Sequence, residues 1–314
     1  MKYLPFLLLL LVTACASGKD SAPNHYDVNT EVQAINRGVA LQQFRDGVAF
    51  LNDHKYDDAL SSFQTCLRME PHNAAALGAS GVAYAAKGDT TNAINFFDQA
   101  LQLRPDPVTY LNRGNLYRSE GRFNEAISDF NACLRLDQTN TTAYLCRASA
   151  YSYLRKYEKG IADINKALTL IPATDASTTV AALVMRADAW GNSQKYDNAR
   201  MDFEKAFSVL PSDLGLHNDY AWFLATCPDA AYRNGSKAVT LATLACNQTG
   251  WSQWQYVDTL AVAYAAEKDF AKAIDCEQRV LQVPNLDPQS RKDIQTRLNL
   301  FLNHQPYLQP PPGK

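Results

Sequence analysis

One stretch of 25 residues occurs five times in this chain, without a gap, between residues 47 and 211. The starting points lie 34, 33, 34 and 39 residues apart. A period near 34 with two helical halves is typical of a solenoid, in which each repeat packs on its neighbours. The copies are GVAFLNDHKYDDALSSFQTCLRMEP (47–71), GVAYAAKGDTTNAINFFDQALQLRP (81–105), GNLYRSEGRFNEAISDFNACLRLDQ (114–138), ASAYSYLRKYEKGIADINKALTLIP (148–172) and ADAWGNSQKYDNARMDFEKAFSVLP (187–211).

The first half of each copy combines a small residue with a large aromatic residue one helical turn later. A small residue lets two helix backbones approach, and the aromatic side chain fills the space beside it. This spacing predicts the first helix of each pair. The small column is Gly47, Gly81, Gly114, Ala148 and Ala187, and the aromatic column is Phe50, Tyr84, Tyr117, Tyr151 and Trp190.

The second half of each copy carries one apolar stripe at i, i+4 and i+7, which predicts a second helix with one buried face. In the first copy this stripe is Ala59, Phe63 and Cys66. Cys66 and Cys133 stand where the other copies have alanine, so we expect packed thiols there and no disulfide. Proline cannot continue a helix and closes four copies, whereas Gln138 closes the third.

These columns resemble the tetratricopeptide repeat, and the resemblance covers residues 40–213 in five copies. It implies an all-α fold, a right-handed superhelical solenoid of antiparallel helix pairs whose first helices line a concave groove. The extra residues between Pro172 and Ala187 are expected to form a longer loop.

The pattern loosens after residue 213 but does not stop. We expect two degenerate repeats and a capping helix over residues 214–304, with the insertion CPDAAYRNG at 227–235. A polar-faced helix at 288–303 is of the kind that caps an exposed solenoid end. Residues 305–314 are rich in proline and are expected to form a disordered tail, with a docking peptide as the alternative.

The N-terminal segment has the layout of an export signal over residues 1–14, with Lys2, an apolar run and then small residues. The apolar run, Leu4 to Val12, is too short to cross a bilayer core, which needs roughly 20 residues. The sequence VTAC at 12–15 resembles the bacterial lipobox, which implies that Cys15 becomes the N-terminus and carries acyl chains such as palmitate.

A membrane-bound form follows from this resemblance. Ala16 and Ser17 after the cysteine favour the outer membrane, facing the periplasm, by resemblance to Gram-negative lipoproteins. Residues 15–39 would then hold lipidated Cys15, a flexible tether and the start of the first helix. The alternative is cleavage after Ala16, which would leave a soluble exported protein.

The sequence contains no arrangement of residues typical of catalysis. Thirty basic and 32 acidic residues give a net charge of −2, so no electrostatic footprint for nucleic acid exists. The five histidines never lie at i, i+4, and HExxH, GxSxG, P-loop and GxGxxG motifs do not occur. We therefore expect no enzyme, no catalytic residues, no cofactor and no metal.

Fold geometry assigns the groove lining to residues one helical turn on either side of the small column. In the first two repeats these residues are apolar or small: Phe44, Val48, Gly78, Val82, Ala85 and Ala86. In the next three they become polar, and the predicted partner-binding residues are Asn115, Arg118, Ser149, Tyr153, Asp188 and Asn192. This gradient suits an extended peptide or a partner helix, and ordinary solvated helix surface is the alternative.

These features together predict a membrane-anchored adaptor or scaffold that binds other envelope proteins or peptides through its groove. Resemblance to bacterial tetratricopeptide lipoproteins adds a role in assembling an envelope complex. A soluble exported module for a peptide or glycan, without lipid on Cys15, is the alternative. Neither reading includes nucleic acid as a partner.

Overall fold

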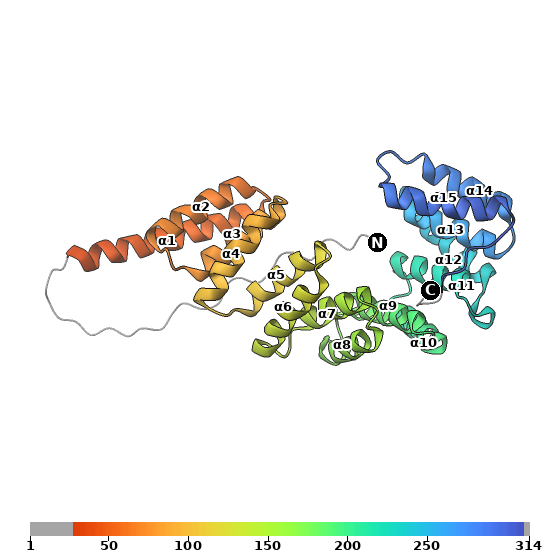
Figure 1. Cartoon of the computed structure of the whole chain (residues 1–314), viewed down its shortest axis with the longest axis horizontal. Coiled ribbons are helices and arrows are strands. Elements are labelled where there is room, and N and C mark those ends of the chain that lie inside the picture. The colour runs from red at the N-terminus through yellow and green to blue at the C-terminus, as the bar shows by residue number, and fades with distance from the viewer. Residues whose placement is uncertain (1–27, 311–314) are drawn as a thin grey trace. The chain divides into compact units, whose positions relative to one another are not determined.

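The structure, a computed structural model, describes residues 28–310, and every regular element within that range is helical (Figure 1). The predicted all-α fold is therefore confirmed. The elements are α1 (Val28–Asn52), α2 (Tyr56–Met69), α3 (Ala74–Ala86), α4 (Thr90–Leu103), α5 (Pro107–Ser119), α6 (Phe123–Leu136), α7 (Thr141–Tyr153), α8 (Tyr157–Leu170), α9 (Ala176–Asn192), α10 (Tyr196–Val209), α11 (Leu214–Thr226), the 3₁₀ helix η1 (Ala230–Tyr232), α12 (Gly235–Gln248), α13 (Trp254–Ala266), α14 (Phe270–Leu281) and α15 (Pro288–Leu302).

The chain forms two compact units, one ending at Ala150 and the other beginning at Tyr151, so that the boundary falls within α7. In the N-terminal unit the helix pairs are α1–α2, α3–α4 and α5–α6. In the C-terminal unit they are α9–α10, α11–α12 and α13–α14, and α15 packs on α14. Within each unit a helix contacts mainly the helices that precede and follow it, as the repeat period predicts.

In the first three repeats the glycine of the small column lies against the phenylalanine of the second helix of the same repeat. A Cβ atom placed on Gly81 would lie 2.7 Å from the ring of Phe97, which is only 1% exposed. Gly47 approaches Phe63 and Gly114 approaches Phe130 in the same way. Glycine at these positions therefore permits the ring of the second helix to touch the backbone of the first.

Proline stands two residues beyond the last helical residue of α2, α4, α8 and α10, where it prevents the helix from continuing. The third repeat reaches the same result without proline. Asp137 accepts hydrogen bonds from the backbone N–H and the hydroxyl of Thr139, at 3.0 and 2.7 Å. Asn140 then accepts one from the Ala143 N–H at 2.9 Å and starts α7, so the turn at Gln138 is fixed by side-chain caps.

The prediction of a long loop between Pro172 and Ala187 was wrong, because only residues 171–175 connect α8 to α9. The extra residues lengthen α9, which has 17 residues, whereas the first helix of the preceding pair, α7, has 13. Asp175 caps the new start by accepting a hydrogen bond from the Thr178 N–H at 3.0 Å. Val180 is only 3% exposed, so the added turns contribute to the core.

Arginine side chains join consecutive helix pairs in a recurring pattern. Arg113 on α5 donates two hydrogen bonds to Asp129 on α6, at 2.8 and 2.6 Å, and also pairs with Asp98 on α4. Arg186 on α9 makes the same bidentate pair with Asp202 on α10, at 2.7 and 2.6 Å. Its third contact, at 2.6 Å, is to Asn165 of α8. Each arginine thereby links its own helix pair to the pair before it.

The C-terminal end is closed by α15, which supports the expected capping role. Ile294, Leu298 and Phe301 are buried against the unit, while most of the remaining α15 side chains are exposed. Arg297 of α15 reaches inward and donates to Asp258 of α13, from Nη2 at 2.7 Å and from Nε at 3.0 Å. The Arg297 Nε atom also lies 3.3 Å from Glu277 Oε1 of α14.

Residues 305–310 pack against the unit, whereas the sequence analysis expected a disordered tail from residue 305. The Tyr307 ring lies 5.8 Å from that of Trp222 on α11, and the Gln309 N–H donates to the Thr226 carbonyl at 2.9 Å. These contacts join residues far apart in sequence, so local composition did not predict them. The predicted signal peptide, lipidated Cys15, the tether up to residue 27 and residues 311–314 lie outside the described residues.

No helix within residues 28–310 is long and apolar enough to span a bilayer. The cysteines of that range are free, and Cys66 and Cys133 are buried as packed thiols, as expected.

Candidate peptide-binding surface

The six predicted groove residues divide equally between the two units. Asn115, Arg118 and Ser149 belong to the N-terminal unit, and Tyr153, Asp188 and Asn192 to the C-terminal unit. All six lie on first helices, namely α5, α7 and α9. None of them is fully buried, so each presents at least part of its side chain to solvent.

Asn115 and Arg118 form a polar cluster with Cys146 of α7 in the N-terminal unit. Burial raises the pKa of the Cys146 thiol, while the charge of Arg118 and the polar side chain of Asn115 oppose the shift. Asn115 Oδ1 and Arg118 Nε are buried atoms without a hydrogen-bond partner among the described residues. An acceptor and a donor therefore stand unsatisfied on one face of α5, one turn apart.

Asp188 and Asn192 are held by local contacts in the C-terminal unit. The Asn192 side chain donates to the Asp188 carbonyl at 2.8 Å and lies 3.5 Å from Gln309 Nε2 of the returning tail. Desolvation, with the nearby carboxylate of Asp219, raises the pKa of Asp188. The exposed position of Asp188 limits this shift, because solvent reaches the side chain. Tyr153 is 52% exposed.

The apolar half of the predicted groove belongs largely to the core. Val82 is 6% exposed, and Phe44, Val48 and Ala85 pack against the buried cluster around Phe63. Only Ala86, among the residues assigned to this half, is exposed. Val82 is therefore unavailable to a partner, whereas Phe44, Val48, Gly78 and Ala85 keep part of their surface exposed beside the core.

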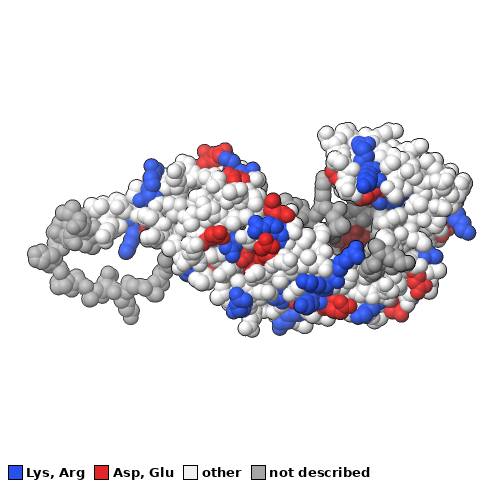
Figure 2. Space-filling model, in the orientation of Figure 1, with Lys and Arg blue, Asp and Glu red and all other residues white. Residues whose placement is uncertain are grey.

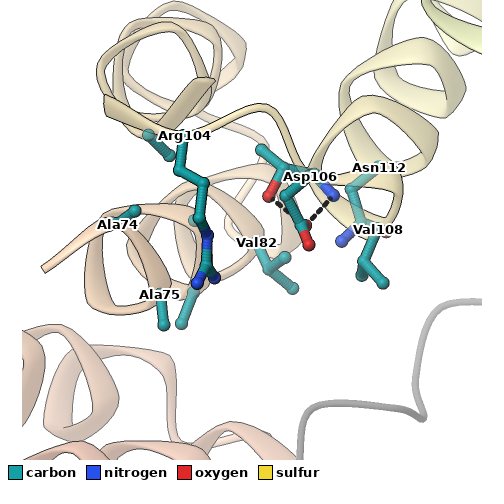
Figure 3. Close-up of a pocket in the computed structure, with 11 residues that line it drawn as sticks. Ala74, Ala75, Val82, Arg104, Asp106, Val108 and Asn112 are labelled. Carbon is teal, nitrogen blue, oxygen red and sulfur yellow. Dashed lines mark hydrogen bonds between the residues drawn. The ribbon is translucent and has the colours of Figure 1, made fainter. Parts of the chain in front are cut away.

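A small pocket lies between α3 and α5, and two of the predicted apolar groove residues, Gly78 and Val82, line it (Figure 3). Its volume is about 30 Å³, enough for a single water molecule. Arg104 extends from the α4–α5 connection towards α3 and covers the pocket beside Ala75. The dashed lines in Figure 3 mark two hydrogen bonds that Asp106 accepts from Thr109, both at 2.8 Å.

Charged side chains do not gather into one dominant patch on the face shown in Figure 2, where acidic and basic residues lie interspersed. Within residues 28–310, no group of three His, Cys, Asp or Glu side chains is placed to hold a metal ion.

Three family models, each described as tetratricopeptide repeat, match residues 44–107, 107–140 and 141–174. The chain is a tetratricopeptide repeat protein over residues 44–174. These matches include four of the five repeats found in the sequence. The α9–α10 pair beyond them keeps the same packing, with Ala187 and Phe203 both buried in one core cluster. Residues 44–174 accordingly form tetratricopeptide repeats, an architecture of the protein-binding class.

Curated relatives resemble only parts of this tetratricopeptide repeat protein. It is 31% identical over 121 residues to Tetratricopeptide repeat protein 13 of Homo sapiens, a match that covers 37% of this chain and 14% of that protein. It is 30% identical over 88 residues to Sperm-associated antigen 1 of Mus musculus, covering 28% and 10%. The chain therefore spans a small fraction of these relatives.

Solved structures share the fold over a longer range. A tetratricopeptide repeat protein from Parabacteroides merdae aligns with a TM-score of 0.65 and 19% identity, covering 85% of this chain and all of that chain. The structure of Pseudomonas aeruginosa pilF aligns with a TM-score of 0.56 and 14% identity, covering 72% and 96%. YrrB, described as a TPR protein with an unusual peptide-binding site, aligns with a TM-score of 0.50 and 14% identity, covering 60% and 96%. At these identities the likeness is one of fold.

The sequence analysis did not predict that Cys146 lies near the unsatisfied atoms Asn115 Oδ1 and Arg118 Nε. Cys146 and Asn115 lie 31 residues apart, so no short motif joins them. The repeat period could have indicated their proximity, because Cys146 lies two residues before Ala148 of the small column and Asn115 directly follows Gly114 of the same column.

Proposed function

We propose that this protein is a membrane-anchored adaptor that binds extended segments of other envelope proteins through the first helices of its repeats. The observation that carries the proposal is the set of polar side chains on the first helices, none of them fully buried: Asn115, Arg118 and Ser149 in the N-terminal unit and Tyr153, Asp188 and Asn192 in the C-terminal unit. Partly exposed donors and acceptors of this kind can hydrogen-bond to the backbone of a bound peptide.

The fold supports a peptide or protein as the partner. Within each unit, repeats that contact mainly their neighbours leave first-helix side chains in a row, and such a row suits an extended chain. YrrB, which shares the fold, is described as having a peptide-binding site. Because the apolar half packs partly on the core, we propose recognition at the polar residues, Asn115, Arg118 and Ser149 of the N-terminal unit and Tyr153, Asp188 and Asn192 of the C-terminal unit.

Cross-linked co-purification from intact envelopes tests the groove. We compare the native chain with a triple variant, Asn115→Ala, Arg118→Ala and Tyr153→Ala. The matched control is Asn124→Ala, Arg135→Ala and Met201→Ala, three exposed side chains on second helices. A set of proteins recovered with the native chain and the control, and lost with the folded groove variant, would support the proposal. Equal recovery with all three proteins would contradict it.

The membrane anchor rests on the lipobox resemblance at residues 12–15. Acyl chains contribute about 0.8 kcal/mol per buried CH₂ group, so a multiply acylated cysteine holds a protein stably at a membrane. Confinement to one surface raises the effective concentration of partners there, so each contact can be weak. We place the protein at the outer membrane, facing the periplasm.

Detergent phase partitioning separates the anchored protein from its soluble alternative. The native chain is expected in the detergent phase and the Cys15→Ser variant in the aqueous phase. Cys133→Ala is the matched control, because alanine fills the same column in other repeats. An aqueous native chain would favour the soluble module for a peptide or glycan.

We propose binding, and no catalysis, as the activity of this chain. The sequence offers no catalytic motif, and the polar cluster at Asn115 lacks a general base beside its cysteine. Turnover of acyl, glycosyl or phosphoryl substrates by the purified chain would contradict this.

A further inference from the structure

The C-terminal unit contains a pocket of about 240 Å³ where three helix ends meet the returning tail. Its walls come from the ends of α11 and α13, the start of α14, the segment after η1, the second residue after α15, and residues 306–308. None of the predicted groove residues lines it. Any ligand of this pocket is therefore distinct from a peptide held by the first helices.

Three basic side chains line the pocket, and no acidic side chain does. Arg233 follows η1, Lys268 lies in the α13–α14 turn, and His304 follows α15. Arg233 Nη1 donates to the carbonyls of Cys227 and Pro228, at 2.8 and 2.9 Å, which fixes one edge of the guanidinium. Its other nitrogens, and Lys268 Nζ, make no hydrogen bond to residues 28–310. The Arg233 guanidinium is therefore fixed at one edge, and neither it nor Lys268 forms an ion pair with a carboxylate of residues 28–310.

The acidic residues nearest in sequence are occupied elsewhere. Asp269 forms an ion pair with Lys272 at 2.7 Å and caps α14 by accepting from the Lys272 N–H. The Glu267 carboxylate packs beside Gly235, where an added Cβ atom would lie 2.6 Å from Oε1. Neither carboxylate lines the pocket or pairs with its cations.

The rest of the lining is apolar. The Phe270 ring stands edge-on to the His304 ring, with centroids 5.1 Å apart. Ala225 and Ala266 supply small apolar surface beside it, and Leu308 of the tail, 42% exposed, lies at the rim. An occupant thus meets apolar surface in one part of the pocket and positive charge in another.

We propose that this pocket binds an organic acid in which one carboxylate is attached to a small apolar group. A guanidinium with a free edge pairs well with a carboxylate, and the volume lies below the roughly 300–1,000 Å³ of pockets for larger ligands. A phosphate would favour an open helix N-terminus, and the N-terminus of α14 is already capped by Asp269. A free acid and the carboxyl end of a polypeptide share the proposed chemistry.

Calorimetric titration of the full chain with phenylacetate tests the proposal, with phenylacetamide as the uncharged probe. Phenylacetate is expected to bind one site, and phenylacetamide at least about fivefold more weakly, since one modest charge contact is worth about 1 kcal/mol. Lys268→Gln is expected to reduce phenylacetate affinity about fivefold, and Leu308→Ala to weaken both probes. Lys292→Gln, an exposed lysine on α15, is the matched control.

The tripeptide Gly-Gly-Phe and its C-terminal amide distinguish the two sources. Binding of the free-acid peptide at least as tightly as phenylacetate would assign the pocket to polypeptide ends. Binding of phenylacetate alone would assign it to free acids. Equal affinity for phenylacetate and phenylacetamide, equal effects of Lys268→Gln and Lys292→Gln, or no binding of any probe would overturn the proposal. The triple variant Asn115→Ala, Arg118→Ala and Tyr153→Ala changes no residue of this pocket. The pocket proposal and the groove proposal can therefore be contradicted independently of each other.

Discussion

At the scale of single residues, the spacing between helix backbone and ring decides which glycines are required. Gly81→Ala would place a methyl group 2.7 Å from the Phe97 ring, which must then move within a filled core. We expect a loss of about 1–3 kcal/mol in the free energy of unfolding. Gly38, also helical, has nothing within 4 Å of its added Cβ, so Gly38→Ala should stabilise by about 0.5–1 kcal/mol. Urea unfolding midpoints of both variants check this, and equal midpoints would contradict it.

The buried carboxyl of Glu277 should make stability depend on pH. It is fully buried, its Oε2 atom has no hydrogen-bond partner among the described residues, and burial, with the charge of Asp258, raises its pKa to about 9. The proton is kept in the folded state and lost above about pH 4.5 in the unfolded state, so this contribution to stability falls as the pH rises from about 4.5 to about 9.

Glu277→Gln keeps the shape of the protonated carboxyl and removes its titration. The variant should therefore lose less stability than the native chain between pH 5 and pH 8.5, measured as urea midpoints at several pH values. Glu204→Gln, at an exposed site, should leave the native pH profile unchanged. Parallel profiles for the native chain and Glu277→Gln would show that Glu277 is ionised in the folded protein.

At the scale of helices, the side chains of Arg113 and Arg186 connect successive helix pairs through hydrogen bonds and ion pairs. Arg113 is 17% exposed and Asp129 6%, so Arg113→Ala leaves the buried Asp129 carboxylate unpaired, whereas Asp129→Ala leaves Arg113 paired with Asp98. We expect Arg113→Ala to cost about 3–5 kcal/mol, Asp129→Ala less, and the double variant clearly less than their sum. A double-mutant cycle measures this coupling. The exposed Arg122–Glu125 pair, 44% and 48% exposed, should contribute at most about 1 kcal/mol and is the control.

Helix positions were largely predictable because they depend on spacing within one repeat. The small residue, the buried side chain of the second helix and the residue that closes that helix all lie within one 25-residue copy, so the same pattern recurs in each repeat. The length of α9 was not predicted, because the polar residues after Pro172 were interpreted as a loop. Asp175 instead caps the N-terminus of the helix, and the residues after it are helical. The tail was not predictable because the partners of Tyr307 and Gln309 lie on α11.

The candidate site was predicted only in part, for a related reason. The small column located the first helices and therefore the six polar residues on them. Whether a first-helix side chain faces solvent or the next repeat depends on packing between repeats, and Val82 faces the core. Unsatisfied atoms such as Asn115 Oδ1 appear only when every neighbour is placed.

At the scale of the whole molecule, the division within α7 should separate unfolding into two steps. Differential scanning calorimetry of the native chain is expected to show two transitions. Gly81→Ala should lower the transition of the N-terminal unit alone. Tyr307→Ala, which removes the ring packed on Trp222, should lower only the other. A single transition that both variants lower equally would show that the units unfold together.

The neighbour-to-neighbour packing of the helix pairs also bears on how the chain acquires its structure. Partners that are close in sequence meet quickly, so each pair can form as soon as the next one is synthesised, without waiting for distant segments. The exception is the carboxyl end, where Gln309 meets Thr226 and Arg297 meets Asp258. Folding of the C-terminal unit is therefore completed only after residues 297–309 have been synthesised, and loss of those residues would leave that unit without the contacts that close it.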